Sequence, residues 1–267
     1  MKNSLYNKVS EILSSYNFYY SINFKDLTTN ETIFWYNHNP NVDSTSFPSA
    51  STIKIFIIIE AYNQINNGII FRDNTIILED KMKVGGAGIL SSYPNNIEIS
   101  IDDLLYLMMT ESDNTATNIL IDILDIDNIN NMIKNLSLKN SSLNRKMMDF
   151  NAIKNGIDNY TSVLDLSTVL EKLYKNSCIN EEYDNLILNI MKNCTNKTKI
   201  SDKLPTGIEV SHKTGELDGV ENDAGIVFTP YGNYILSILT KNGENHDEIT
   251  AISDISKVIY DCYCLDK

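Results

Sequence analysis

Residues 47–56 read FPSASTIKIF and separate a strand-forming segment of the chain from a helix-forming one. Before them, FYYSINFKDL (18–27) alternates apolar with polar residues, and ETIFWYN (31–37) follows after a polar turn. This pattern predicts a β-hairpin. From Ser51 to about residue 192, apolar residues instead recur at helical spacing. The stretch is therefore predicted to connect a sheet to a group of helices.

The predicted helical region contains several segments with a 3.6-residue apolar period. Their ranges are 53–66, 101–111, 114–124, 128–136, 161–176 and 181–193. One further helix is predicted at the N-terminus, where Leu5, Val9, Ile12 and Leu13 share one side, and another at 247–264. Helices thus dominate the middle of the chain and also occur at its two ends.

Strand patterns return after Pro205, at 209–217, 222–230 and 233–242, with turn residues between them that suit antiparallel hairpins. The sequence thus predicts an α+β fold with a five-stranded antiparallel sheet built from both chain termini, flanking helices and an inserted all-helical lobe. We assign residues 1–47 and 195–267 to the sheet lobe and 48–194 to the helical lobe. The active site is expected in the cleft between them.

Composition excludes several classes of function. The net charge of −13 and the isoelectric point near 4.6 disfavour binding to nucleic acid. No stretch approaches the ~20 apolar residues of a membrane span, and the first 17 residues lack the apolar core of a secretory signal. We expect a cytoplasmic monomer that acts on a small molecule, or a secreted one if a leader precedes this sequence. The cysteines lack zinc-like spacing and are predicted to be reduced thiols; they are Cys178, Cys194, Cys262 and Cys264. We expect no metal and no cofactor.

Lys54 is the only lysine in a run that is otherwise almost wholly apolar, and Ser51 precedes it by three residues. Burial of an ammonium group without a partner is unfavourable and lowers its pKa, so that such a lysine can act as a base. Residues i and i+3 of a helix are neighbours, and a serine beside a base is an activated nucleophile. The alternative is that Ser51 caps the helix while Lys54 extends into solvent.

Two further motifs have both a structural and a functional interpretation. Ser112-Asp113-Asn114 lies between two predicted helices, where it forms a helix cap or directs a hydroxyl and an amide to a common point. Lys213-Thr214-Gly215 lies on a predicted strand. In the structural interpretation Lys213 is a charge that protects the edge of the sheet, and in the functional one Gly215 lets a substrate backbone lie against the strand.

Together, Ser51-x-x-Lys54, Ser-Asp-Asn and Lys-Thr-Gly resemble the motif set of class A β-lactamases and penicillin-binding proteins. The longer stretches ASTIK (50–54), ESDNTATNILID (111–122) and SHKTGELDGVENDAGIV (211–227) are also similar to the class A β-lactamase family. The resemblance covers nearly the whole chain. It implies a serine hydrolase that opens a β-lactam or a related cyclic amide or ester.

The resemblance assigns catalytic roles to four residues. Ser51 attacks the substrate carbonyl, and Lys54 takes its proton. The backbone N–H groups of Ser51 and Glu216 form the oxyanion hole. Ser112 relays a proton to the leaving nitrogen.

The same resemblance assigns the substrate contacts. Asn114 holds the substrate's side-chain amide and braces Lys54. Lys213 and Thr214 bind the substrate carboxylate, and Gly215 lets the substrate lie close to the strand.

The sequence departs from the family in the loop that activates the deacylating water, where the family pattern is R-x-E-x-x-L-N. Arg145 and Asn151 match its two ends, but Met147 replaces the glutamate. A thioether cannot accept a proton from water, so rapid deacylation is in question. Asp149 is the nearest carboxylate in the sequence that could substitute.

Three alternatives remain open from the sequence. The first is a penicillin-binding or D-alanyl peptidase-like protein that acylates but turns over slowly. The second is a binding module that keeps the cleft without turnover. The third is a Ser-His-Asp triad, for which His212 is the only histidine next to a motif.

Overall fold

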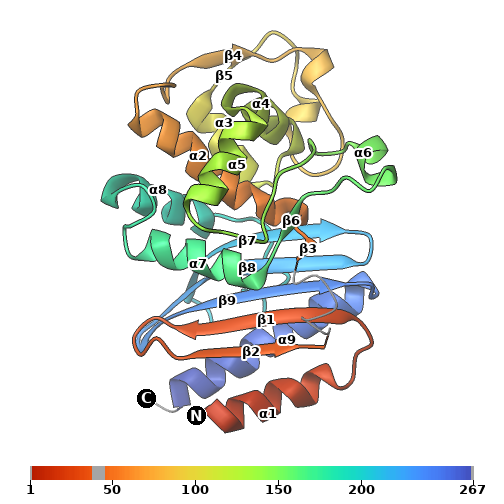
Figure 1. Cartoon of the computed structure of the whole chain (residues 1–267), viewed down its shortest axis with the longest axis vertical. Helices are drawn as coiled ribbons and strands as arrows, with labels where there is room; N and C mark the ends of the chain where they lie inside the picture. The colour runs from red at the N-terminus through yellow and green to blue at the C-terminus, as the bar shows by residue number, and fades with distance from the viewer. Residues whose placement is uncertain (1, 38–45, 266–267) are drawn as a thin grey trace.

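The computed structural model describes residues 2–37 and 46–265. Strands from both chain ends form one antiparallel five-stranded sheet in the order β2-β1-β9-β8-β7, as the sequence predicted (Figure 1). The pairing of β1 with β9 joins the two ends of the chain. The strands are β1 (Tyr19–Asp26), β2 (Thr32–Tyr36), β7 (Glu209–Leu217), β8 (Val220–Thr229) and β9 (Gly232–Lys241).

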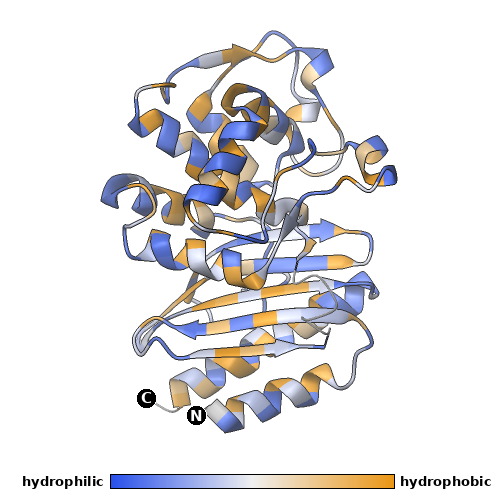
Figure 2. Ribbon diagram, viewed as in Figure 1, coloured by the Kyte–Doolittle hydropathy of each residue, from blue (hydrophilic) through white to orange (hydrophobic). Residues whose placement is uncertain are grey.

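Helices α1 (Lys2–Leu13) and α9 (Asn245–Leu265) pack against each other and cover one face of the sheet (Figure 1). The predicted apolar side of α1 is buried in this layer, and burial of such side chains stabilises it by about 1.5–3 kcal/mol each. In Figure 2, apolar and polar residues alternate along the strands. The buried residues of the layer include Leu5, Val9, Leu13, Ile22, Phe24, Tyr234, Leu236, Ile252, Ile255 and Ile259.

The opposite face of the sheet contacts α7 (Val163–Tyr174), which packs on β1, β8 and β9. Helix α2 (Lys54–Asn66) is the centre of the second core, with ten buried residues between Lys54 and Gln64. A helix that is apolar on nearly all sides must be surrounded by other helices. Those that contact it are α3 (Ile101–Thr110), α4 (Asn114–Leu124), α5 (Ile126–Asn135) and α8 (Glu181–Lys192).

Short elements connect these helices, and the sequence pattern did not reveal them. Strands of two or three residues are too short to establish a hydrophobic period, and they form here through long-range pairing. The pairs are β3 (Phe47–Pro48) with β6 (Tyr160–Thr161) and β4 (Thr75–Ile77) with β5 (Glu98–Ser100). The remaining elements are the 3₁₀ helices η1 (Ala50–Ile53), η2 (Asp80–Met82) and η3 (Leu90–Ser92) and the helix α6 (Phe150–Lys154).

The four cysteines are free thiols. Among the described residues, no helix has the length and apolar character needed to cross a bilayer. The division into lobes at residues 1–47 with 195–267 and 48–194 stays a prediction. Helices α7 and α8 both contact the sheet, so they couple the two parts of the chain closely.

Candidate active site

The junction predicted at residues 47–56 places a hydroxyl next to an amine. Ser51 lies on η1, and Lys54 is the first residue of α2, one turn later. The Lys54 side chain is fully buried, and its Nζ atom lies 3.0 Å from Ser51 Oγ. Lys54 therefore does not extend to solvent, which removes the structural alternative for this motif.

The Lys54 amine is surrounded by oxygen atoms. In addition to Ser51 Oγ, it reaches the Ser112 carbonyl oxygen at 2.7 Å, Ser112 Oγ at 3.1 Å and Asn114 Oδ1 at 3.1 Å. Burial holds the pKa of Lys54 well below that of an ordinary lysine; Lys213 lowers it further, while Asp113 acts in the opposite direction. The site thus shifts the equilibrium of Lys54 toward the neutral amine, whose lone pair can accept a proton from the Ser51 hydroxyl.

Ser112 connects two buried lysines. Its Oγ accepts hydrogen bonds from Lys54 Nζ and from Lys213 Nζ, both at 3.1 Å. Ser112 lies between α3 and α4 in a left-handed conformation, with φ of 54°, which non-glycine residues adopt rarely. Burial also lowers the pKa of Lys213, whose Nζ donates to the Thr214 carbonyl oxygen at 3.0 Å. The strained backbone of Ser112 is of the kind found at functional sites that the surrounding structure holds in place.

Asp113 has a structural role that differs from that of its two neighbours. Its carboxylate caps α4 through the N–H of Ala116 and accepts the N–H groups of Ile89 and Leu90 at 2.7 and 2.8 Å. Gly88 lies so close that a Cβ there would fall 2.3 Å from Asp113. The middle residue of the motif thus attaches the segment 84–90 to the site, while Ser112 and Asn114 contact Lys54.

Strand β7 lies directly against η1. A Cβ at Gly215 would be 3.0 Å from the Ala50 Cβ, the Ser49 carbonyl oxygen and the Ser51 nitrogen. Gly215 therefore permits close packing of β7 onto the backbone of Ser51, a different reason from the substrate approach expected from sequence. Asn222 on β8 fixes the same contact by donating to the carbonyl oxygens of Pro48 and Ser49.

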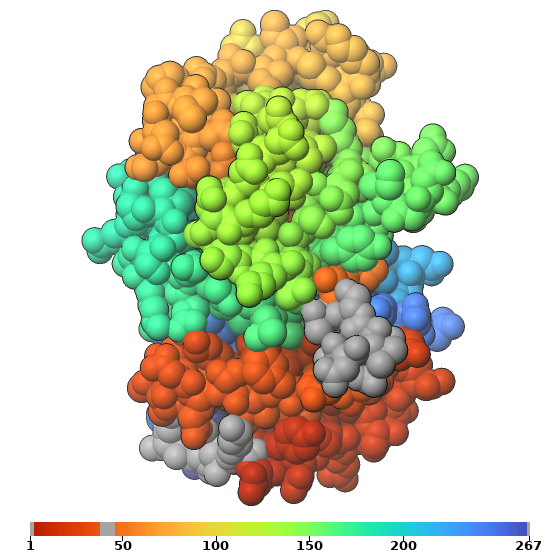
Figure 3. All heavy atoms as spheres, viewed as in Figure 1, coloured from red at the N-terminus to blue at the C-terminus, as the bar shows by residue number. Residues whose placement is uncertain are grey.

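These elements enclose a cavity of about 210 Å³. The predicted residues Ser51, Ser112, Asn114, Arg145, Met147, Lys213, Thr214, Gly215 and Glu216 line it, and Lys54 lies behind Ser51. Asp149 and Asn151 are exposed and are not part of the lining. They belong to the segment around α6, which projects from the body of the molecule at the right of Figure 3.

The backbone at Met147 is held by a residue that the sequence analysis missed. Asn118 on α4 accepts the Met147 N–H at 2.8 Å and donates to its carbonyl oxygen at 3.1 Å. The buried Arg145 forms an ion pair with the partly buried Asp158 at 2.7 Å, which anchors the same segment. Asp149 caps α6 by accepting the Ala152 N–H. Asn118 follows Asn114 by four residues and so lies on the same side of α4, which was the available signal.

His212 does not line the cavity. Its Nδ1 atom lies 3.0 Å from the Asp223 carboxylate, and both side chains, on β7 and β8, are fully buried. Asp223 also accepts the N–H of Ile200. Among the described residues, no cluster of histidine, cysteine, aspartate or glutamate has a geometry suited to a metal ion.

Comparisons with known proteins identify relatives of this chain in sequence and in fold. The β-lactamase VEB-1 of Pseudomonas aeruginosa is 24% identical over 81% of this chain and 78% of its own length. The β-lactamase structure from Sphaerobacter thermophilus DSM 20745 is 27% identical, covers 99% of this chain and 98% of its own, and superposes with a TM-score of 0.88. An acyl-enzyme complex of a PBP-A mutant with penicillin G is 26% identical over 98% of this chain and 96% of its own, with a TM-score of 0.86. The sequence model of the Beta-lactamase enzyme family matches residues 4–263, and this chain therefore belongs to that family.

Proposed function

We propose that the protein is a serine hydrolase that opens a β-lactam, or a related cyclic amide or ester, through a covalent acyl-enzyme on Ser51. The observation that carries this proposal is the 3.0 Å contact between Ser51 Oγ and the fully buried Lys54 Nζ. A neutral amine at this distance is within the range that general-base catalysis requires. Family membership supports the same class of reaction.

In the proposed acylation, the Ser51 hydroxyl proton passes to the Lys54 nitrogen as Oγ bonds to the substrate carbonyl carbon. The carbon–nitrogen bond then breaks, and the leaving nitrogen receives a proton through Ser112 Oγ, which contacts both lysines. The N–H groups of Ser51 and Glu216 stabilise the oxyanion, because the packing of Gly215 onto Ser51 brings both backbones to one end of the cavity.

Binding roles follow from the rest of the lining. The Asn114 side chain is oriented by Lys54 Nζ and by the Gly85 carbonyl oxygen, to which it donates at 3.2 Å. It faces the substrate's side-chain amide in our proposal. Lys213 and Thr214 interact with the substrate at the end where the family resemblance implies a carboxylate.

We propose that deacylation is slow. Met147 lines the cavity where the family resemblance implies a glutamate, and Asp149 is used as a helix cap outside it. Among the described residues, the carboxylates that line the cavity are Glu111 and Glu216. The second candidate function is thus a penicillin-binding protein that is acylated and releases the product slowly, which the same observation at Met147 favours.

The test is a time course of intact protein mass after mixing with excess benzylpenicillin, with the free drug followed in parallel. We expect one equivalent of drug on the wild-type chain and none on Ser51→Ala. Labelling that survives in Ser51→Ala would refute the nucleophile. Rapid consumption of drug with little adduct would refute slow deacylation, and an inert wild-type protein would favour a binding module without turnover.

A further inference from the structure

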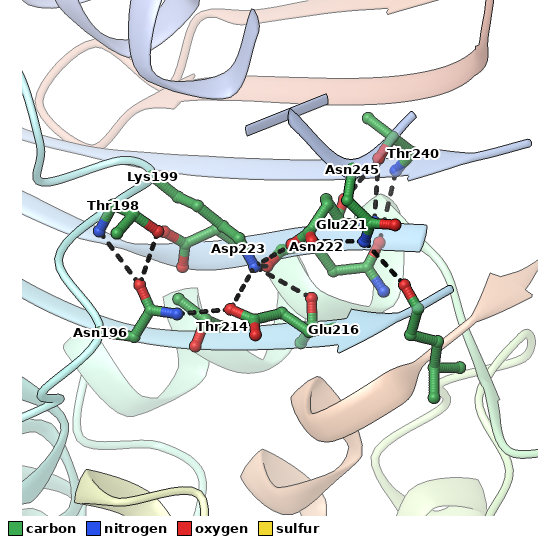
Figure 4. Close-up of polar contacts among 12 residues, drawn as sticks. Asn196, Thr198, Lys199, Thr214, Glu216, Glu221, Asn222, Asp223, Thr240 and Asn245 are labelled. Atoms are coloured by element: carbon green, nitrogen blue, oxygen red, sulfur yellow. Dashed lines mark hydrogen bonds and ion pairs between the residues drawn. The ribbon is translucent and has the colours of Figure 1, made fainter. Parts of the chain in front are cut away.

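A third buried lysine, which no sequence motif indicates, lies beside the cavity. The side chain of Lys199 is fully buried, and its Nζ atom lies 2.5 Å from Glu221 Oε2 and 3.2 Å from Glu216 Oε1. It also donates to the Gly215 and Asn222 carbonyl oxygens at 3.1 and 3.3 Å. Figure 4 shows this group along β7 and β8, with Asn196 beside Glu216.

The charges in this group do not cancel. One ammonium group faces two carboxyl groups, so the formal charges of the Lys199, Glu216 and Glu221 side chains sum to one negative charge. Glu221 is 3% exposed, has the shorter contact with Lys199 and accepts a hydrogen bond from Asn245 at 2.6 Å. The side chain of Glu216 is 51% exposed and lines the cavity. The excess negative charge is therefore presented to the cavity at Glu216.

Glu216 is held in position with one oxygen atom available. Its Oε1 accepts hydrogen bonds from Asn196 Nδ2 and Lys199 Nζ. Within residues 2–37 and 46–265, no hydrogen bond engages its Oε2. Thr214 and Glu216 are two residues apart on β7, so their side chains leave the strand on the same side. A substrate group that reaches Thr214 thus meets a fixed carboxylate oxygen.

Among the described residues of the lining, no exposed cation offsets this carboxylate. Lys213 is fully buried, and its Nζ already donates to Ser112 Oγ and the Thr214 carbonyl oxygen. Arg145 is paired with Asp158. The second carboxylate of the lining, Glu111, adds to the negative charge, and the whole chain carries −13. The field in this part of the cavity is therefore unfavourable to a second anion.

We propose that Glu216 determines substrate charge: the part of the cavity beside Thr214 accepts a neutral or cationic substituent in preference to a carboxylate. This inference rests on the proposed acylation of Ser51 and refines its substrate class. The Glu216 carboxylate opposes the attraction of Lys213 for an anion, and its Oε2 accepts a hydrogen bond from a substrate N–H or ammonium group.

Three compounds with one reactive ring and different charges test the proposal: benzylpenicillin, its methyl ester and its 2-(diethylamino)ethyl ester. The second-order rate constant of acylation is measured for each by intact mass. In the wild-type protein we expect the cationic ester to react at least tenfold faster than the free acid, with the methyl ester between them. Glu216→Gln keeps the hydrogen bonds to Oε1 but removes the charge. It should lower the ratio of the rate constant for the cationic ester to that for the free acid at least tenfold.

Glu209→Gln is the matched control, because Glu209 is on the same strand, is exposed and lies outside the cavity. It should leave the ratio unchanged. A wild-type preference for the free acid would overturn the inference while acylation stands. So would a ratio of rate constants in Glu216→Gln that is unchanged from the wild type. If no compound acylates Ser51, the proposed function fails, and calorimetric titration of the same compounds into wild type and Glu216→Gln then tests the inference. Tighter binding of the cationic ester that is lost in the variant supports the inference. Absence of such a preference in the wild type refutes it.

Discussion

Replacement of Asp113 should destabilise the protein more than replacement of any ordinary helix cap. Its carboxylate is 1% exposed and accepts the N–H groups of Ile89, Leu90 and Ala116 at 2.7 to 2.9 Å. Asp113→Ala leaves all three donors without an acceptor. Two of these bonds attach the segment 84–90, so the loss extends beyond α4.

The magnitude follows from this count of bonds. A hydrogen bond to a charged group contributes about 1.5–3 kcal/mol, and such bonds within one network are not fully additive. We therefore expect Asp113→Ala to lower the free energy of unfolding by about 4–6 kcal/mol, out of the roughly 5–15 kcal/mol typical of a folded protein. Asp113→Asn keeps one acceptor oxygen and should lower it by about 2–3 kcal/mol.

Urea unfolding followed by circular dichroism measures both values. Asp149→Ala is the matched control, since Asp149 caps α6 through a single bond at an exposed position. It should lower the free energy of unfolding by no more than about 1 kcal/mol. If Asp113→Ala is no more destabilising than Asp149→Ala, the structural role assigned to this carboxylate is wrong.

Met147→Glu should convert a persistent acyl-enzyme into a turning-over one, because Asn118 holds the backbone and the new carboxylate replaces a side chain of the lining. Deacylation should accelerate by about 10²–10⁴, measured from the lifetime of the adduct, and Met147→Gln should show no gain. The acylation rate should rise with pH through the depressed pKa of Lys54 and level off well below the ordinary lysine value of about 10.4; a rise confined to higher pH would contradict a neutral Lys54 base. Burial raises the pKa of Glu248 to about 7, so its contribution to stability is full at low pH and is lost as the pH rises through 7. Glu248→Gln should flatten the change in urea midpoint between pH 5 and pH 8, and an unaltered slope would show that Glu248 does not titrate there.

Much of the fold could be predicted because its elements are long. The apolar period of α1, α3, α4 and α8 and the alternation of β7, β8 and β9 are local properties of the chain. The two-residue strands β3 and β6 could not be predicted, since they exist only through pairing across more than a hundred residues. Helix α6 could not be predicted either, because its five residues carry no buried side chain and so show no apolar period.

The sequence by itself determined which chemical groups are available: a serine three residues before a lysine, a second serine followed by an amide, and a lysine on a strand. The tertiary structure decided which of them meet. Ser112 lies 58 residues from Lys54 and 101 from Lys213, yet its Oγ contacts both. The same packing turned Asp113 away from the cavity and placed the charge of Glu216 within it. Residue types and short spacings are local, whereas desolvation and charge pairing depend on groups brought together from distant parts of the chain, so the pKa of Lys54 and the charge of the cavity are properties of the fold.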